Sequence, residues 1–282
     1  MVYQVQIDDG LPENPAHLLS GFVHTEFESG SALLNDALRR ARRAEHDLRA
    51  AQEVQSWLFP RHCPVVRGLA YAGGCQQARQ LGGDFYDFIG NGDSRLGIVV
   101  GDIAGKGIAA ALSMATLRTL IRSQYPEKAE SLPGLMASVN ALFHESTPSA
   151  TYSTLFVASY DDATHRLRYV NCGHLAPLVL HANGRVSQLA SSAPAIGLFA
   201  DWQGSQAEIE LLPGDLVAIF TDGITEASNS SGEEFGTDRL VRQLVACEHL
   251  PVSATVANTL TLVSGYGREQ EDDMTLVGLR VL

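Results

Sequence analysis

Aspartate residues stand at the ends of several apolar runs in this 282-residue chain. Asp102 closes the run "RLGIVVGD", Asp222 closes "DLVAIFTD", and Asp84 opens "DFYDFIG" after a Gly-Gly pair. Asp272 and Asp273 directly precede the run "MTLVGLRVL". One Asp-Gly pair is ordinary turn chemistry. Several carboxylates around one core would repel each other, and hard cations such as Mg²⁺ or Mn²⁺ prefer oxygen ligands. The pattern therefore indicates an oxygen-liganded cation site.

Asp87 follows Asp84 by three residues, in a stretch 84–89 that is extended if the predicted strand 85–89 includes its preceding residue. Successive side chains of a strand point to opposite faces, so Asp84 shares its face with Tyr86 and Phe88, whereas Asp87 points away. We therefore expect Asp84 near the cations. Asp87 is assigned a place behind the ligands or facing substrate.

The Gly105-Lys106 pair that follows Asp102 suggests a nucleotide phosphate loop. That loop needs a glycine, four residues and then Gly-Lys-Ser/Thr. Here only three residues separate Gly101 from Gly105, and Gly107 stands where the hydroxyl is required. The phosphate-loop interpretation is therefore excluded. Lys106 is interpreted as a solvated turn residue or as a group that approaches substrate phosphate.

Short apolar runs separated by turn signals continue from about residue 66 to the C-terminus. Hairpin signals at 91–94, 161–165 and 182–185 predict antiparallel pairing. The predicted strands are 69–75, 85–89, 96–101, 153–160, 166–171, 177–181, 186–189, 207–211, 216–221 and 274–282. Helical periodicity covers 107–124, 132–145, 237–247 and 251–265. Grouped helices between hairpins indicate an α+β fold in which helices cover antiparallel sheets.

Residues 31–58 predict one long helix, because alanines and leucines recur there at near-heptad spacing. This helix either packs on its own domain or forms a dimeric coiled coil, and Pro60 ends it. We therefore expect a loose extension over 1–30, a regulatory helix over 31–60 and a domain over 61–282.

The composition excludes several classes of protein. A net charge of −12 argues against a nucleic-acid surface. No run of 18 apolar residues and no signal-peptide pattern occur, so neither a membrane span nor secretion is predicted. The four cysteines form no C-x-x-C pair, which fits a reducing cytoplasm and argues against a thiolate zinc site.

Five motifs occur in an order that resembles the PPM (type-2C) metal-dependent phosphatases, specifically the bacterial SpoIIE-like branch of sigma-factor regulators. They are "GGDFYD" (82–87), "GDIAGKG" (101–107), "NCGH" (171–174), "FTDGITEA" (220–227) and "DDMTL" (272–276). The helix end "AQEVQSWLFP" (51–60) also resembles that branch, so the likeness runs from about residue 50 to the end. The resemblance implies a four-layer αββα sandwich of two stacked antiparallel sheets flanked by helices.

The resemblance also implies a serine/threonine protein phosphatase that uses two or three Mn²⁺ or Mg²⁺ ions. Asp102 would bridge two ions with help from the Ile103 carbonyl, Asp222 and Asp272 would bind the first ion, and Asp84 would serve the second. Asp102 and Asp222 are the predicted catalytic residues. Asp273 and Lys106 are placed behind the ligands or facing substrate. A hydroxide generated from water between the ions would attack the phosphorus in line.

Two departures from the better-known branch concern proton transfer and phosphate binding. That branch has a His two residues after the bridging aspartate, whereas this chain has Ala104, and no arginine is assigned to the phosphate. His174 is interpreted as a turn histidine that supports the sheets. The implied substrate is a phosphorylated regulator, a STAS-type anti-sigma antagonist. A catalytically silent binding module that acts through helix 31–58 is the alternative, and a phosphodiesterase or nucleotide hydrolase is a third class.

Overall fold

The computed structural model describes residues 15–282 except 62, 93, 268 and 269, with side chains from residue 34 onward. The chain divides into two compact units, residues 1–50 and 51–282. This division falls ten residues before the boundary expected from the sequence, so the end of the long helix belongs with the second unit.

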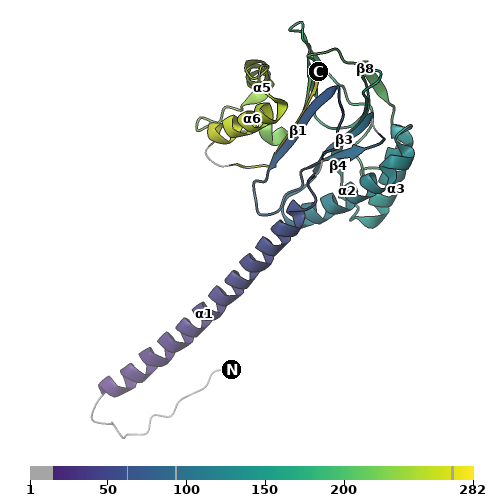
Figure 1. Ribbon diagram of the computed structural model, residues 1–282. Coiled ribbons are helices and arrows are strands. Elements are labelled where there is room, and N and C mark those ends of the chain that lie inside the picture. The colour runs from purple at the N-terminus through teal and green to yellow at the C-terminus, as the bar shows by residue number, and fades with distance from the viewer. Residues whose placement is uncertain (1–14, 62, 93, 268–269) are drawn as a thin grey trace. The chain divides into compact units, whose positions relative to one another are not determined.

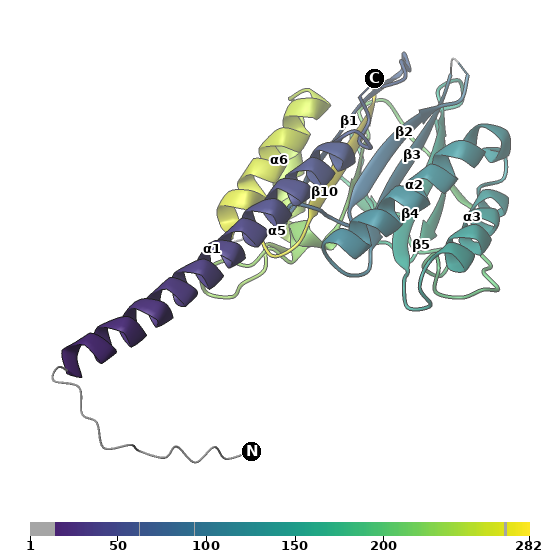
Figure 2. The same cartoon turned by 90° about the horizontal axis from the view of Figure 1, so that it is seen from below.

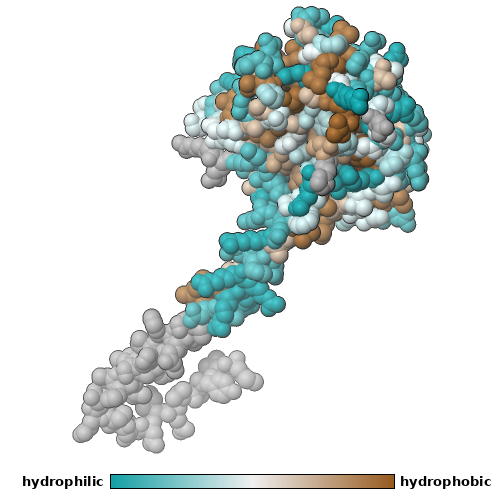
Figure 3. Space-filling view, viewed as in Figure 1, coloured by the Kyte–Doolittle hydropathy of each residue, from teal (hydrophilic) through white to brown (hydrophobic). Residues whose placement is uncertain are grey.

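Helix α1 (Pro15–Ser56) contains the whole predicted helix except its last two residues. It begins at Pro15, which corrects the expectation of a loose segment over 1–30; residues 1–14 lie outside the described residues. Proline suits the first turn of a helix, because the N–H that it lacks would have no partner there. The sequence has no further proline before Pro60 that would break the helix. Between residues 34 and 50 every side chain but that of Leu48 is exposed, and Figure 3 shows a largely hydrophilic surface there.

The second unit contains two five-stranded antiparallel sheets, as expected for the α+β sandwich. The first sheet has the order β1-β10-β9-β6-β7, and the second has the order β2-β3-β4-β5-β8. All ten predicted strands are present, with ends that differ by at most two residues from the prediction. Their bounds are β1 Leu69–Gln76, β2 Phe85–Gly90, β3 Arg95–Ile103, β4 Ser153–Asp161, β5 Arg166–Cys172, β6 Leu178–Leu180, β7 Val186–Gln188, β8 Ala207–Glu210, β9 Leu216–Phe220 and β10 Met274–Val281.

The helices lie on the two outer faces of the sheets. Helices α2 (Ile108–Lys128) and α3 (Leu132–Ser146) cover the second sheet, while α5 (Gly236–Ala246) and α6 (Val252–Tyr266) cover the first (Figures 1 and 2). One buried cluster fills the space between the sheets, and one lies under each pair of helices. The four-layer αββα architecture is thereby confirmed.

The ends of strands from both sheets meet at one place. In the first sheet, β9 runs antiparallel to β10, with Phe220 opposite Leu276, so the end of β9 lies beside the start of β10. Helix α4 (Asp222–Thr225) follows β9 directly. In the second sheet, β3 ends at Ile103, and β2 begins at Phe85. These ends carry the aspartates singled out by the sequence.

Candidate metal centre

Asp102, Asp222 and Asp272 line one cavity of about 290 Å³. Ile103 and Lys106 also line it. Because Asp102 ends a strand of the second sheet while Asp222 and Asp272 flank strands of the first, the cavity brings the two sheets' carboxylates together. We call these three residues the outer carboxylates.

The surroundings of Asp102 and Asp222 disfavour their charged forms. Burial raises the pKa of Asp102 to about 7, and the charges of Asp222 and Asp272 add to that rise. Burial and the charge of Asp272 also raise the pKa of Asp222. A cation placed among these carboxylates would relieve the repulsion.

Asp84 lies deeper, with 2% of its surface exposed. Its Oδ2 accepts hydrogen bonds from the hydroxyls of Thr221 and Thr275, each at 2.7 Å. Burial raises the pKa of Asp84 well above its usual range, the charge of Asp102 adds to the rise, and the two hydroxyls oppose it. Asp84 therefore belongs to the same electrostatic cluster as Asp102.

Asp273 is a backbone anchor. Its carboxylate accepts hydrogen bonds from the backbone N–H groups of Ala78 at 2.8 Å, Gly83 at 2.9 Å and Asp84 at 3.4 Å. It thus fixes the turn that leads into β2. We call Asp84 and Asp273 the inner carboxylates.

Gln55, at the end of α1, binds the same turn. Its side-chain amide donates to the carbonyl of Gly82 at 2.8 Å, and its carbonyl accepts from the Gly82 N–H at 3.3 Å and from the Gln77 amide at 2.7 Å. Gln55 is buried although its neighbours on the helix are exposed. The last turn of α1 is therefore connected to the segment that positions Asp84.

Asp87 lies away from the cavity. Its buried carboxylate pairs with Arg118 at 3.0 Å and with Arg122 at 2.8 Å, both on α2. The opposite orientations of Asp84 and Asp87 follow from strand alternation, as the sequence predicts. Asp87 ties β2 to α2 and lines none of the cavities that contain the outer carboxylates.

Two glycines allow the close approach of these segments. A Cβ on Gly83 would lie 2.9 Å from the backbone oxygen of Ile103, and one on Gly223 would lie 2.1 Å from that of Asp273. The "GGD" and "TDG" motifs therefore contain glycine because backbone passes against backbone here.

His174 and Thr154 line a neighbouring cavity of about 210 Å³ that also contains Asp102 and Asp222. His174 Nδ1 lies 3.1 Å from Thr154 Oγ1, and its backbone N–H donates to Asn171 Oδ1. Burial lowers the pKa of His174 to about 4. At neutral pH this imidazole is therefore uncharged. It contacts Thr154 at the cavity wall and is not an imidazolium that could act as an acid.

The donor set fits hard divalent cations. The cavity offers carboxylate oxygens and backbone carbonyls, and no thiol or imidazole lines it. Across residues 15–282, apart from the four undescribed positions, no three His, Cys, Asp or Glu side chains form a ready-made metal cage. The assignment of Asp84, Asp102, Ile103, Asp222 and Asp272 as ligands thus stays a prediction.

The family model described as "Stage II sporulation protein E (SpoIIE)" matches residues 92–282. This match covers the larger part of the chain. The chain therefore belongs to the SpoIIE family. It carries the PP2C-type phosphatase domain expected from the five motifs.

This SpoIIE-family chain covers different shares of two curated relatives. It is 24% identical to phosphoserine phosphatase RsbU of Bacillus subtilis over 275 residues, covering 96% of this chain and 81% of RsbU. It is 26% identical to protein IcfG of Synechocystis sp. over 274 residues, covering 86% of this chain but only 42% of IcfG.

Solved structures support the fold of the domain. The SiaA-PP2C domain of Pseudomonas aeruginosa superimposes with a TM-score of 0.74 at 20% identity, over 86% of this chain and 98% of that one. RsbX, solved in complex with magnesium, superimposes with a TM-score of 0.61 at 14% identity, over 78% of this chain and 99% of that one. At these identities the likeness concerns the fold alone.

Sequence reasoning missed four polar residues that the SpoIIE-type domain places around the carboxylates. Thr221 and Thr275 were inside the quoted motifs, next to the aspartates, but a threonine in a strand is usually read as a β-former. Gln55 lies in the helix end 51–60 that resembles the family, and Thr154 lies in none of the motifs; the role of each depends on a partner that is distant in sequence.

Proposed function

We propose that the chain is a metal-dependent phosphoserine/phosphothreonine protein phosphatase that uses two divalent cations. One observation carries this proposal: Asp102, Asp222 and Asp272, from strand ends of both sheets, share one cavity, and the pKa values of Asp102 and Asp222 are raised there by burial and by neighbouring carboxylates. The name of the RsbU relative supports phosphoserine as the target.

In this proposal each residue has a distinct task. The cations would be held by Asp102, Asp222, Asp272 and the Ile103 carbonyl. Asp84, which is more deeply buried, would serve the second cation. When bound, the cations would lower the pKa of a water molecule and neutralise charge on the phosphoryl group. The strand ends hold the ligand oxygens rigidly, so little reorganisation is needed when charge develops.

Protonation of the leaving serine oxygen is left to solvent or to the substrate complex. Ala104 has no side chain that could donate a proton. The imidazole of His174 is buried and unprotonated at neutral pH. Neither residue can therefore act as the general acid.

The substrate we propose is a phosphorylated STAS-type regulator of a sigma-factor pathway. The five motifs of the SpoIIE-like branch support this substrate class. A phosphoserine on a folded regulator would have to enter the cavity from the open side that Lys106 and Tyr152 line.

We also propose that helix α1 regulates the domain by forming a homodimer. Leu34 and Leu38 are 62% and 47% exposed on this helix, which leaves apolar side chains available to a second copy. Gln55 gives this helix a direct connection to the Gly82 turn that precedes Asp84. Dimerisation could in this way act on the metal ligands.

The test compares dephosphorylation of a phosphoserine STAS-type protein by wild type, Asp102→Asn and Asp222→Asn with Mn²⁺ present. We expect each substitution to reduce the rate by more than roughly 100-fold. Loss of a residue that only hydrogen-bonds a metal ligand costs about 10- to 100-fold, and loss of the ligand itself should cost more. The control is Asp201→Asn, an exposed aspartate outside the cavities, which should retain wild-type activity.

Two results would overturn the proposal. If wild type and both variants are equally active, Asp102 and Asp222 are not catalytic residues. Calorimetry that shows no binding of Mn²⁺ or Mg²⁺ at millimolar concentration would favour the silent binding module. A panel of phosphopeptides, cyclic nucleotides and nucleoside triphosphates distinguishes the phosphatase from a phosphodiesterase or nucleotide hydrolase.

A further inference from the structure

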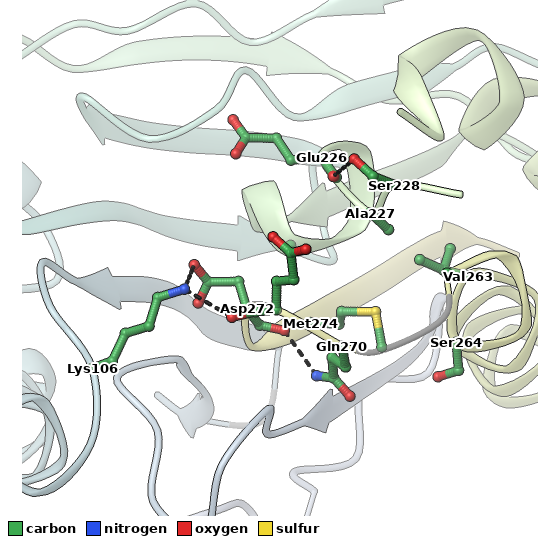
Figure 4. A pocket seen from close by; sticks show the side chains of 12 residues that line it. Lys106, Glu226, Ala227, Ser228, Val263, Ser264, Gln270, Asp272 and Met274 are labelled. Atoms are coloured by element: carbon green, nitrogen blue, oxygen red, sulfur yellow. Dashed lines mark hydrogen bonds and ion pairs between the residues drawn. The ribbon is translucent and has the colours of Figure 1, made fainter. Parts of the chain in front are cut away.

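Lys106 extends across the edge of the metal centre. Its Nζ lies 2.8 Å from Asp272 Oδ2 and 2.8 Å from the backbone oxygen of Glu271 (Figure 4). Lys106 belongs to the turn after β3, whereas Asp272 precedes β10 in the other sheet. The ion pair therefore joins the two sheets at the residue predicted to bind a cation.

The charges around Lys106 are mostly negative. The cavity of Asp102, Asp222 and Asp272 is lined by one cationic side chain among the described residues, that of Lys106. Its charge lowers the pKa of Asp222 and of Glu226 against the other influences on them, so its field extends beyond its direct partner. Lys106 thus acts on Asp222 as well as on its direct partner Asp272.

The turn holds Lys106 at this position without packing it in place. Gly105 and Gly107 flank it with φ values of +103° and +77°, a conformation that favours glycine, and nothing lies within 4 Å of a Cβ added at either. The Lys106 side chain is 42% exposed and that of Asp272 is 44% exposed. The ammonium can therefore leave Asp272 and reach solvent without disturbing the core.

A divalent cation bound at Asp272 would repel the ammonium that pairs with the same carboxylate. We propose that Lys106 is a built-in counter-cation that holds Asp272 in the metal-free protein and competes with the incoming ion for it. Binding of Mn²⁺ or Mg²⁺ exchanges the ammonium–carboxylate pair for a metal–carboxylate bond, and Lys106 moves into solvent. This inference rests on the proposed function, because it assumes that the outer carboxylates bind a cation.

One of the three outer carboxylates, that of Asp272, is paired with an ammonium, whereas no cationic side chain besides Lys106 lines the cavity among the described residues. The lysine stabilises the metal-free state and lowers the apparent affinity for metal. The affinity is thereby set partly by a residue that is not a ligand.

The experiment measures the dissociation constant for Mn²⁺ by calorimetry in wild type, Lys106→Met, Lys106→Gln and Lys106→Arg. We expect Lys106→Met and Lys106→Gln to bind Mn²⁺ roughly two- to fivefold more tightly, the range given by the worth of a partly exposed ion pair. Lys106→Arg keeps the charge and should stay near wild type. The matched control is Lys128→Met on α2, whose ammonium binds Gln124 and Ser138.

Thermal unfolding gives a second readout that does not depend on activity. In EDTA, Lys106→Met should unfold at a lower temperature than wild type, while its gain on adding Mn²⁺ should be larger. Unchanged or weaker Mn²⁺ binding by both uncharged variants would overturn the inference and leave the phosphatase proposal standing. Absence of Mn²⁺ binding by wild type would overturn both.

Discussion

The inner and outer carboxylates lie in the same cluster but have opposite surroundings. Asp273 accepts hydrogen bonds from three backbone N–H groups, and Asp84 accepts two hydroxyls. Asp102 instead shares its cavity with Asp222 and Asp272, whose charges raise its pKa. A buried carboxylate with several donors stabilises the fold, whereas a cation would relieve the repulsion between carboxylates that face one another.

The largest effect on stability is expected at the inner carboxylates. Asp273→Ala leaves the N–H groups of Ala78, Gly83 and Asp84 without their acceptor, so we expect a loss of about 3 kcal/mol or more in the free energy of unfolding. Urea unfolding in EDTA measures it. The control Asp201→Ala changes an exposed aspartate and should have little effect. If both substitutions cost the same, the three N–H contacts of Asp273 do not stabilise the fold.

An effect of similar size but opposite sign is expected at Asp102. Burial and neighbouring charges raise its folded pKa from 3.8 to about 7, so the folded protein without metal is destabilised once this carboxyl ionises. Below about pH 4 the carboxyl is protonated in both folded and unfolded chains, and the penalty vanishes; above about pH 7 it is complete. Asp102→Asn should thus stabilise the metal-free protein by up to roughly 4 kcal/mol near pH 8.

Urea unfolding of wild type and Asp102→Asn in EDTA, from pH 4 to pH 8, checks this difference. The two curves should converge at the acidic end. A variant that is less stable than wild type at pH 8 would show that Asp102, like Asp273, is a structural carboxylate.

The smallest effect is expected where α1 meets the inner turn. Gln55→Ala removes the side-chain contacts to Gly82 and should cost about 1–2 kcal/mol. The exposed Gln52 provides the matched control, Gln52→Ala. Activity should fall with Gln55→Ala and not with the control, because only Gln55 contacts the turn before Asp84.

A chain that begins near residue 61 sharpens the same point. If α1 regulates the centre, this shorter chain should be monomeric by ultracentrifugation and altered in activity or metal affinity. A monomeric shorter chain with unchanged activity and metal affinity would exclude a regulatory role of the helix.

The local elements were predictable from the sequence because each depends on neighbouring residues. Strand alternation placed Asp84 and Asp87 on opposite faces, and hairpin signals such as 161–165 gave antiparallel pairing. The motifs also brought out every aspartate of the cluster. The start of α1 differs from the expected loose extension over 1–30, because Pro15 opens the helix.

Tertiary structure alone decided what each carboxylate meets. Asp272 and Asp273 are adjacent in sequence, yet one pairs with Lys106 and the other binds the backbone around Gly83. Their partners lie more than 160 residues away and arrive there only because the two sheets pack face to face. Residue type and spacing determined that the chain places acids at strand ends; the packing of the two sheets determined which of them bind backbone N–H groups and which of them face other carboxylates.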